Sequence, residues 1–129
     1  MFSPGRARHR TRAVKNFLLL SILCLTAALG CRRQPTVLGQ KPDSIPVVIA
    51  SISARTNSPS LTVRGQIIEK CPVAGCWFYL RDQTGTIKVD TKASRFVVVK
   101  IPLGTTVVVS GKIISEGSGR ILEASGLEY

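Results

Sequence analysis

The sequence contains a single histidine, His9, which lies in the basic segment at the start of the chain. Serine and cysteine hydrolases commonly use a histidine base, and zinc sites usually combine histidine with cysteine or carboxylate ligands. We expect the segment that holds His9 to be removed, so that no histidine remains for a catalytic triad, a zinc site or a haem ligand. The sequence therefore predicts a protein that is not an enzyme and that carries no cofactor and no metal ion.

The chain also lacks an apolar run long enough to span a membrane as a helix. Its longest uncharged apolar run, residues 17–30 (FLLLSILCLTAALG), has 14 residues. A helix of that length measures about 21 Å, whereas the hydrocarbon core of a bilayer is about 30 Å thick. The basic residues that precede this run are Arg6, Arg8, Arg10, Arg12 and Lys15. A basic segment followed by a short apolar run is typical of a signal peptide, here residues 1–30.

The tetrapeptide ALGC at residues 28–31 resembles a bacterial lipobox, in which small or apolar residues precede a cysteine. The resemblance implies cleavage after Gly30, lipid attachment at Cys31 and a membrane-anchored position in the cell envelope, outside the cytoplasm. Ala28 departs from the pattern, in which leucine is more usual. An ordinary secretory signal and an uncleaved anchor are the alternatives, and neither would place lipid on Cys31. Arg32 stands where aspartate would favour the inner membrane, so an outer membrane is favoured in a cell that has one.

Removal of residues 1–30 changes the charge of the chain. The whole sequence has 18 basic and seven acidic residues and a net charge of +11. The first 30 residues hold five of the basic residues and none of the acidic ones, which leaves +6 for the remainder. Much of the basic character therefore belongs to targeting. The remaining excess is ordinary for a solvated surface, although it favours anionic lipids or polymers over cationic ones.

The part of the chain from Cys31 onward predicts a tether and one small domain. Residues 31–45 contain two prolines, several polar residues and no amphipathic period, which is typical of a flexible linker after the lipid-attachment cysteine. Residues 46–129 are sufficient for a single domain with its own core.

Most of this domain has the residue pattern of β-strands. Apolar and polar residues alternate or β-branched residues cluster in five segments: 61–67, 77–81, 87–90, 105–115 and 120–124. A further extended segment, 47–53, precedes them, and polar turns are expected at 82–85 and 116–119. No apolar period of 3.6 residues persists for three turns, and at most one helical turn is expected within 92–100. Asp82 and Asp90 are expected to be turn and strand-end residues, not an acid/base pair.

The strand pattern resembles a known barrel family. Five strands with a glycine inside the first and the fourth favour a small closed barrel. The segments VRGQI (63–67), FYLRDQTGTIKV (78–89) and PLGTTVVVSGKI (102–113) resemble the OB-fold, particularly its anticodon-binding-like group. The segment CPVAGCW (71–77) is similar to that of small exported bacterial proteins of uncharacterised role. The resemblance implies an all-β, five-stranded Greek-key OB-fold barrel, with a shorter connection between the third and fourth strands than in members that carry a helix there.

In such a barrel, strand alternation assigns each side chain to the core or to the surface. The side chains expected to point inward belong to Val63, Gly65, Ile67, Phe78, Leu80, Ile87 and Val89. The residues expected on one outer face, the predicted binding face, are Arg64, Gln66, Trp77, Tyr79, Arg81 and Lys88. This face of the second and third strands commonly binds ligands in OB-folds. Aromatic and basic groups suit single-stranded nucleic acid, but export separates the protein from most nucleic acid, so an unknown protein or small molecule is the favoured ligand.

Two cysteines remain in the domain, Cys71 and Cys76, and they flank a four-residue loop between the first two strands. An even pair in an oxidising compartment predicts a disulfide, which would stabilise this loop by roughly 2 kcal/mol. Two alternatives stay open. The thiolates could bind a soft ion such as Cu(I), or the pair could be redox-active, although its spacing differs from the C-x-x-C of thioredoxin-like sites.

Taken together, the sequence predicts a lipid-anchored OB-fold domain outside the cytoplasm that binds a partner. A thiol-based metal or redox protein is the first alternative, and a single-stranded nucleic-acid-binding protein is the second.

Overall fold

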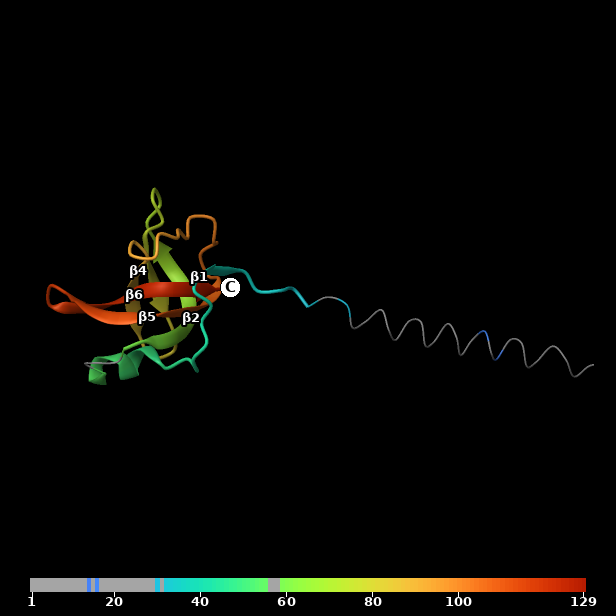
Figure 1. The fold of residues 1–129 in the computed structure, drawn as a ribbon, viewed down its shortest axis with the longest axis horizontal. Coiled ribbons are helices and arrows are strands. Elements are labelled where there is room, and N and C mark those ends of the chain that lie inside the picture. Colours follow the sequence, from blue (N-terminus) through green and yellow to red (C-terminus); the bar gives the residue numbers. More distant parts are fainter. Residues whose placement is uncertain (1–13, 15, 17–29, 31, 56–58) are drawn as a thin grey trace, which may run out of the picture. The chain divides into compact units, whose positions relative to one another are not determined.

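The computed structural model describes residues 14, 16, 30, 32–55 and 59–129. The chain divides into two units, Met1–Gln34 and Pro35–Tyr129. Cys31 and most of the predicted signal segment lie outside the described residues. Within the described ranges, no helix is both long and apolar enough to cross a membrane. The second unit contains the fold that is described below (Figure 1).

The described part of the second unit consists of strands and one short 3-10 helix (Figure 1). In chain order, its elements are β1 (Val37–Gly39), η1 (Ile49–Ala54), β2 (Leu61–Lys70), β3 (Trp77–Arg81), β4 (Thr86–Asp90), β5 (Thr106–Glu116) and β6 (Gly119–Glu128). The five segments that the sequence predicts as strands correspond to β2 through β6. The last of them is longer than predicted, because it continues past the small residues Ser125 and Gly126, which weaken the apolar alternation.

Five strands close into a barrel. The order β6-β4-β3-β2-β5 runs around the sheet, and an additional pairing of β5 with β6 joins its two ends. The β4–β6 contact is parallel, whereas the other four contacts in the ring are antiparallel. A closed barrel of five strands is therefore confirmed.

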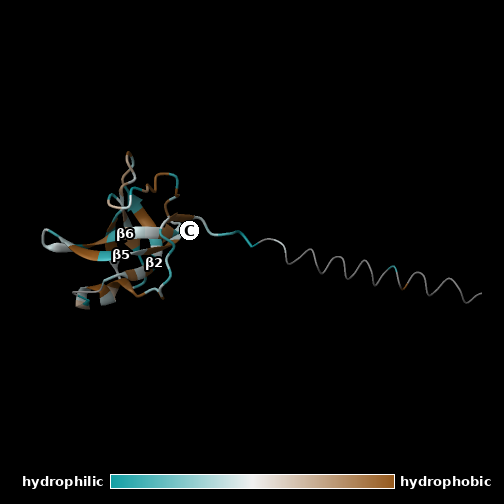
Figure 2. Ribbon diagram, in the orientation of Figure 1, coloured by the Kyte–Doolittle hydropathy of each residue, from teal (hydrophilic) through white to brown (hydrophobic). Residues whose placement is uncertain are grey.

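Strand alternation fills the barrel interior as predicted. All seven residues that were expected to point inward are buried. Val63, Ile67, Phe78, Leu80 and Val89 are 0% exposed. Removal of this apolar surface from water is the main force that favours the closed barrel. Figure 2 shows apolar and polar residues mixed along the strands, with further apolar residues in the loops.

A short 3-10 helix covers one end of the barrel, in place of the extended segment predicted for 47–53. Val47 and Val48 are extended, and Val47 forms a parallel bridge with Val63. Ile49 and Ile52 then lie three residues apart, so one turn of a 3-10 helix directs both into the core, where they are 7% and 3% exposed. Arg120 stabilises the end of η1 by donating from Nη1 to the carbonyl oxygens of Ile52 (3.2 Å) and Ser53 (2.7 Å).

A loop closes the other end of the barrel. The connection between β4 and β5 contains turns at residues 92–95 but no helix, so the single helical turn allowed by the sequence does not form there. Val98 and Ile101 from this loop are 0% and 1% exposed. Lys70 holds the loop in place, because its ammonium group donates to the carbonyl oxygens of Val98 (3.4 Å), Val99 (2.7 Å) and Ile101.

Part of the predicted tether belongs to the barrel unit. Within residues 31–45, Val37–Gly39 forms β1 and pairs with the second half of β6. Thr36 and Tyr129 exchange two backbone hydrogen bonds of 2.8 and 3.0 Å, and the Gln40 N–H donates to the Ser125 carbonyl oxygen at 3.0 Å. The strand occurs because β4 pairs with β6 only at residues 121–123, which leaves the edge at 126–128 open for β1.

Candidate functional site

The structure places the six residues of the predicted binding face on adjacent strands. Gln66 of β2 lies opposite Arg81 of β3, and Tyr79 of β3 lies opposite Lys88 of β4. Arg64, Gln66 and Arg81 are exposed, whereas the other three residues are partly buried. The face does not form one site, however. It divides into a groove, an aromatic pair and an ion-paired lysine.

The groove has a volume of about 580 Å³, and we call it the β2–β3 groove. Three of its lining residues, Arg64, Gln66 and Arg81, come from the predicted binding face. The other lining residues are Pro46, Val47, Val48, Gly65, Asp82, Gln83, Thr84 and Thr106. Gly65 lies on β2 between Arg64 and Gln66, and Gln66 pairs with Arg81 of β3. A Cβ atom at Gly65 would lie 2.5 Å from the Arg81 carbonyl oxygen, so only glycine allows the strands to approach this closely.

Two walls of the groove are tied together by Asp82. Its Oδ1 atom accepts hydrogen bonds from the Thr84 N–H (2.6 Å), the Thr84 hydroxyl (2.6 Å) and the Gly85 N–H (3.0 Å). Its Oδ2 atom accepts from the Ile49 N–H at 2.8 Å. The first set closes the β3–β4 turn, and the last bond holds the start of η1 against that turn. The predicted role of Asp82 as a turn residue is confirmed.

The carboxylate of Asp82 is occupied by hydrogen bonds within the groove wall. Partial burial alone would raise the pKa of Asp82, but the hydrogen bonds from Thr84, Ile49 and Gly85 outweigh it and lower the pKa below its ordinary value. Among the described residues, the ion pairs are Lys88–Glu116 and Lys92–Asp90. Neither of the groove arginines takes part in them, so the groove presents two guanidinium groups to solvent.

The aromatic pair lies further along β3. The rings of Trp77 and Tyr79 make an edge-to-face contact with centroids 5.9 Å apart and an interplanar angle of 75°. Such a contact holds the two rings in fixed orientations. Both residues face the same side of the sheet as Arg81, because they occupy alternate positions of one strand. They do not line the groove.

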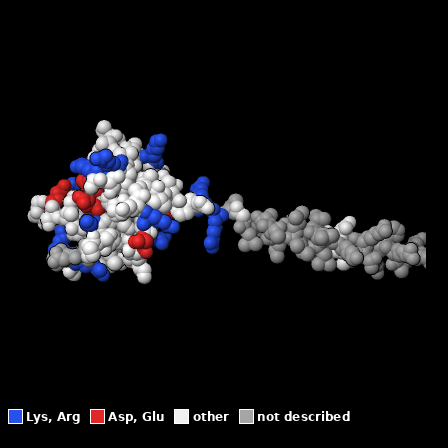
Figure 3. Space-filling model, in the orientation of Figure 1, with Lys and Arg blue, Asp and Glu red and all other residues white. Residues whose placement is uncertain are grey.

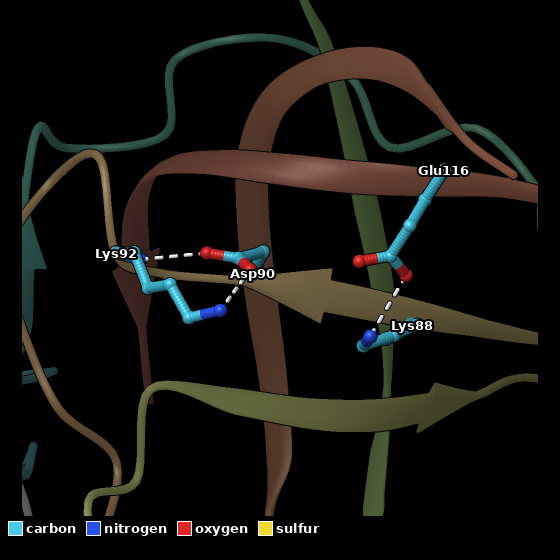
Figure 4. A network of polar contacts seen from close by, with 4 residues as sticks. All are labelled: Lys88, Asp90, Lys92 and Glu116. Atoms are coloured by element: carbon cyan, nitrogen blue, oxygen red, sulfur yellow. Dashed lines mark hydrogen bonds and ion pairs between the residues drawn. The ribbon is translucent and has the colours of Figure 1, made fainter.

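Lys88 is engaged by the β5–β6 hairpin. Its Nζ atom lies 2.8 Å from Oε2 of Glu116, and this hydrogen bond raises the pKa of Lys88 (Figure 4). The neighbouring Asp90 accepts from the backbone N–H of Lys92 at 2.8 Å and lies 3.5 Å from its ammonium group (Figure 4). Lys88 is therefore held at the hairpin and does not contribute to the groove.

Cys71 and Cys76 are free thiols in the structure, so the predicted disulfide is not present in it. The loop is instead organised by hydrogen bonds. The Cys71 N–H donates to the Trp77 carbonyl oxygen at 3.0 Å, and the Cys71 sulfur accepts from the Ala74 N–H at 3.4 Å. The predicted lipidation residue, Cys31, lies outside the described residues. In the described part of the chain, no three histidine, cysteine or acidic side chains are close enough together to hold a metal ion.

The residues that sequence reasoning missed are the groove walls. Asp82, Gln83 and Thr84 carried a detectable signal, because an aspartate that opens a turn before a glycine often accepts backbone hydrogen bonds. Val47 and Val48 carried none. They reach the groove because the Val47 N–H bonds to the Thr62 carbonyl oxygen at 2.8 Å, a contact that no local pattern encodes.

Comparisons with known proteins support the fold. No protein-family model matches the sequence, and no curated protein sequence matches it significantly. The structure is similar to that of the hypothetical protein YgiW from E. coli, with a TM-score of 0.52 and 19% sequence identity, over 67% of this chain and 90% of that chain. At this identity the likeness concerns the fold. Together with the closed five-stranded barrel, it establishes an OB-fold, as the sequence predicted.

Proposed function

We propose that the protein is a lipid-anchored binding module outside the cytoplasm, and that its β2–β3 groove binds a carboxylate- or phosphate-bearing ligand. An OB-fold barrel is well suited to such a role, because loops and one sheet face provide a surface that the rigid barrel holds in place. The resemblance of ALGC at residues 28–31 to a lipobox supports the lipid anchor and the location.

The observation that carries the proposal is the pair of arginines in one groove. Arg64 and Arg81 are exposed, and both line a cavity of about 580 Å³. A guanidinium group offers a planar set of donors that matches a carboxylate or phosphate, and two such groups discriminate strongly against neutral or cationic ligands. Gln66, directly opposite Arg81, adds an amide that can donate or accept.

The aromatic pair extends this surface beyond the groove. Residues two apart in a strand are separated by about 7 Å, so Tyr79 and Trp77 lie about 7 and 14 Å from Arg81 along the same face. A ligand that places its anionic group between the arginines could lay a flat or apolar portion against these rings. The arrangement therefore favours an extended ligand over a single small ion.

The overall charge supports an anionic partner. On the face shown in Figure 3, lysine and arginine side chains predominate over acidic ones. The net charge of +6 that remains after removal of residues 1–30 raises the local concentration of anions and speeds their encounter with the groove. Binding should consequently weaken as the salt concentration rises.

The double variant R64Q/R81Q tests the groove. This variant removes both guanidinium groups but keeps polar side chains. The matched control is K41Q/K100Q, which removes the same amount of charge from exposed positions outside the groove. We expect R64Q/R81Q to weaken binding of a polyglutamate peptide or of inorganic polyphosphate at least about tenfold, measured by isothermal titration calorimetry, because each charge-assisted hydrogen bond contributes about 1.5–3 kcal/mol.

The choice of probes separates the ligand classes. Preference for polyglutamate indicates an acidic polypeptide partner, and preference for polyphosphate indicates a phosphate-bearing one. An oligothymidylate that binds more tightly than both would support the single-stranded nucleic-acid alternative instead. Equal losses in R64Q/R81Q and K41Q/K100Q would show that only net charge matters and would contradict a groove site.

A further inference from the structure

The loop between β2 and β3 holds two thiols at the end of β3 that is remote from the groove. Cys76 directly precedes β3, whereas the groove residue Asp82 directly follows it. Both cysteines are partly exposed residues. These thiols have no part in the anion site that we propose above.

Backbone hydrogen bonds fix the shape of this loop. The Gly75 N–H donates to the Cys71 carbonyl oxygen at 3.2 Å and closes one turn. The loop is also bound to the β4–β5 connection, because the Val98 N–H donates to the Gly75 oxygen (3.0 Å) and the Thr91 N–H to the Cys76 oxygen (2.9 Å). The loop therefore holds its conformation without a bond between the sulfur atoms.

Gly75 makes this close packing possible. Its φ angle is +59°, and a Cβ atom there would lie 2.8 Å from the Val99 backbone nitrogen. Only glycine adopts this conformation in this space without strain. The turn consequently brings its amide groups back toward the first cysteine.

One of those amides donates directly to the Cys71 sulfur: the Ala74 N–H lies at hydrogen-bond distance, 3.4 Å. In order of size, the amides of Ala74, Val73 and Gly75 lower the pKa of Cys71 to about 7, although partial burial opposes them. Donors that converge on a sulfur favour its anion, and the thiolate is the reactive form of cysteine.

We propose that Cys71 and Cys76 form a thiol–disulfide exchange site, in which Cys71 is the nucleophile and Cys76 the resolving thiol. The Ala74 N–H donates to the Cys71 sulfur, and the backbone hydrogen bonds of the turn hold Cys76 in the same loop. The exposed apolar side chain of Val73, which is 89% exposed, lies in the same loop and offers a contact to a polypeptide substrate.

The exchange uses a disulfide as the oxidant. The Cys71 thiolate attacks one sulfur of this disulfide, a mixed disulfide forms, and the other sulfur leaves as a thiolate that takes a proton from water. Cys76 then loses its proton and attacks the Cys71 sulfur, which releases the second half of the oxidant as a thiol. The protein loses two electrons and two protons, and the oxidant gains them. A dithiol reductant reverses every step.

The pH dependence of alkylation tests the role of Cys71. The full-length chain is treated with iodoacetamide over a range of pH, and peptide mass spectrometry reads Cys71 and Cys76 separately from Cys24 and Cys31. In C76S, whose serine keeps a donor beside Cys71, we expect the rate at Cys71 to reach half its maximum near pH 7. A half-maximum near pH 8.5, the ordinary value for cysteine, would overturn the assignment of the nucleophile.

The midpoint is the decisive readout, because the rate itself changes little. At pH 7 a lowered pKa increases the thiolate fraction about 15-fold, but the lower basicity reduces the intrinsic reactivity of each thiolate, so the net gain is about threefold. In C71S, Cys76 should react more slowly at this pH than Cys71 does in C76S. Thermal unfolding of both variants checks that the barrel remains folded.

Equilibration with glutathione tests the exchange itself. We expect the wild-type pair to be oxidised and reduced reversibly across mixtures of reduced and oxidised glutathione, and we expect C76S, but not C71S, to accumulate the mixed disulfide. A pair that stays oxidised in reduced glutathione alone would be a permanent bridge and would overturn the proposal. Stoichiometric Cu(I) that remains bound to the pair during the titration would overturn it in favour of a metal site. The anion titrations of the groove do not depend on either result.

Discussion

Asp82 shows how a single residue can serve both a turn and a remote segment. Its two carboxylate oxygens accept hydrogen bonds from Thr84 and Gly85 in its own turn and from Ile49, which lies 33 positions earlier. The turn role could be predicted, because it depends on neighbours within three residues. The contact with Ile49 could not, because it requires the barrel to bring η1 and the turn together.

Asp82→Asn should destabilise the domain and change its response to acid. Because the pKa of Asp82 is lower in the folded than in the unfolded chain, its stabilising effect is present above the ordinary pKa of 3.8 and is lost as pH falls through the folded value. We expect a loss of about 1 kcal/mol at pH 7, since the group is solvent-screened. The variant should also lose less stability between neutral pH and acid than the wild type, as measured by urea unfolding.

Asp43→Asn is the matched control for this experiment. Asp43 is exposed and accepts only a hydrogen bond from the Ser44 hydroxyl among the described contacts, at 3.1 Å. Its substitution should leave the stability profile unchanged. Identical acid profiles for Asp82→Asn and the wild type would contradict the assigned role of Asp82.

At the scale of elements, the main strands were predictable and the short elements were not. Alternation or clustered β-branched residues predicted β2 through β6, because each strand has one face in the core. β1 has three residues, too few for a periodic pattern, and it lies between two prolines. It forms because the open edge of β6 offers unpaired backbone groups, so its existence depends on the completed barrel.

Truncation at two positions tests the contribution of β1. A chain that begins at Pro35 keeps β1, whereas one that begins at Lys41 lacks it. We expect the shorter chain to remain folded but to lose about 2 kcal/mol, because it lacks several backbone hydrogen bonds and the packing of Leu38 against the core. In a domain of this size that loss lowers the melting temperature by about 10 °C.

The chain that begins at Pro35 is the control, and it should melt at the same temperature as the mature protein. Equal melting temperatures for the two truncated chains would show that β1 does not stabilise the barrel, even though its backbone pairs with β6.

At the scale of the whole molecule, the proposed anion groove and the proposed dithiol site lie at opposite ends of β3, and the barrel holds them apart. Such a separation allows one partner to be bound through charge while the thiols exchange with another. Whether either site faces the cell envelope depends on the segment before the barrel, whose role is predicted from residues 1–31 alone. This part of the proposal has its own test.

Mass spectrometry of the protein from bacterial membranes tests the anchor. We expect a chain that begins at Cys31 and carries lipid, because ALGC resembles a lipobox, in which cleavage and modification occur at the cysteine. Cys31→Ser should release the protein from the membrane fraction or leave it unprocessed. Cys24→Ser, the control within the same segment, should change neither property. Recovery of intact Met1, or of an unmodified Cys31, would contradict the lipid anchor.

Local patterns in the sequence were sufficient to predict which strand residues point into the barrel, the turn at Asp82, and the outward position of Arg64 and Arg81. Each of these features depends on residues close together along the chain. Closure of the barrel settled what those patterns left open. It added β1 to the edge of β6, and it made a groove wall of Val47 and Val48. It left Lys88 bound to Glu116, outside that groove. All three result from contacts between segments remote in sequence, which form only when the strands have assembled.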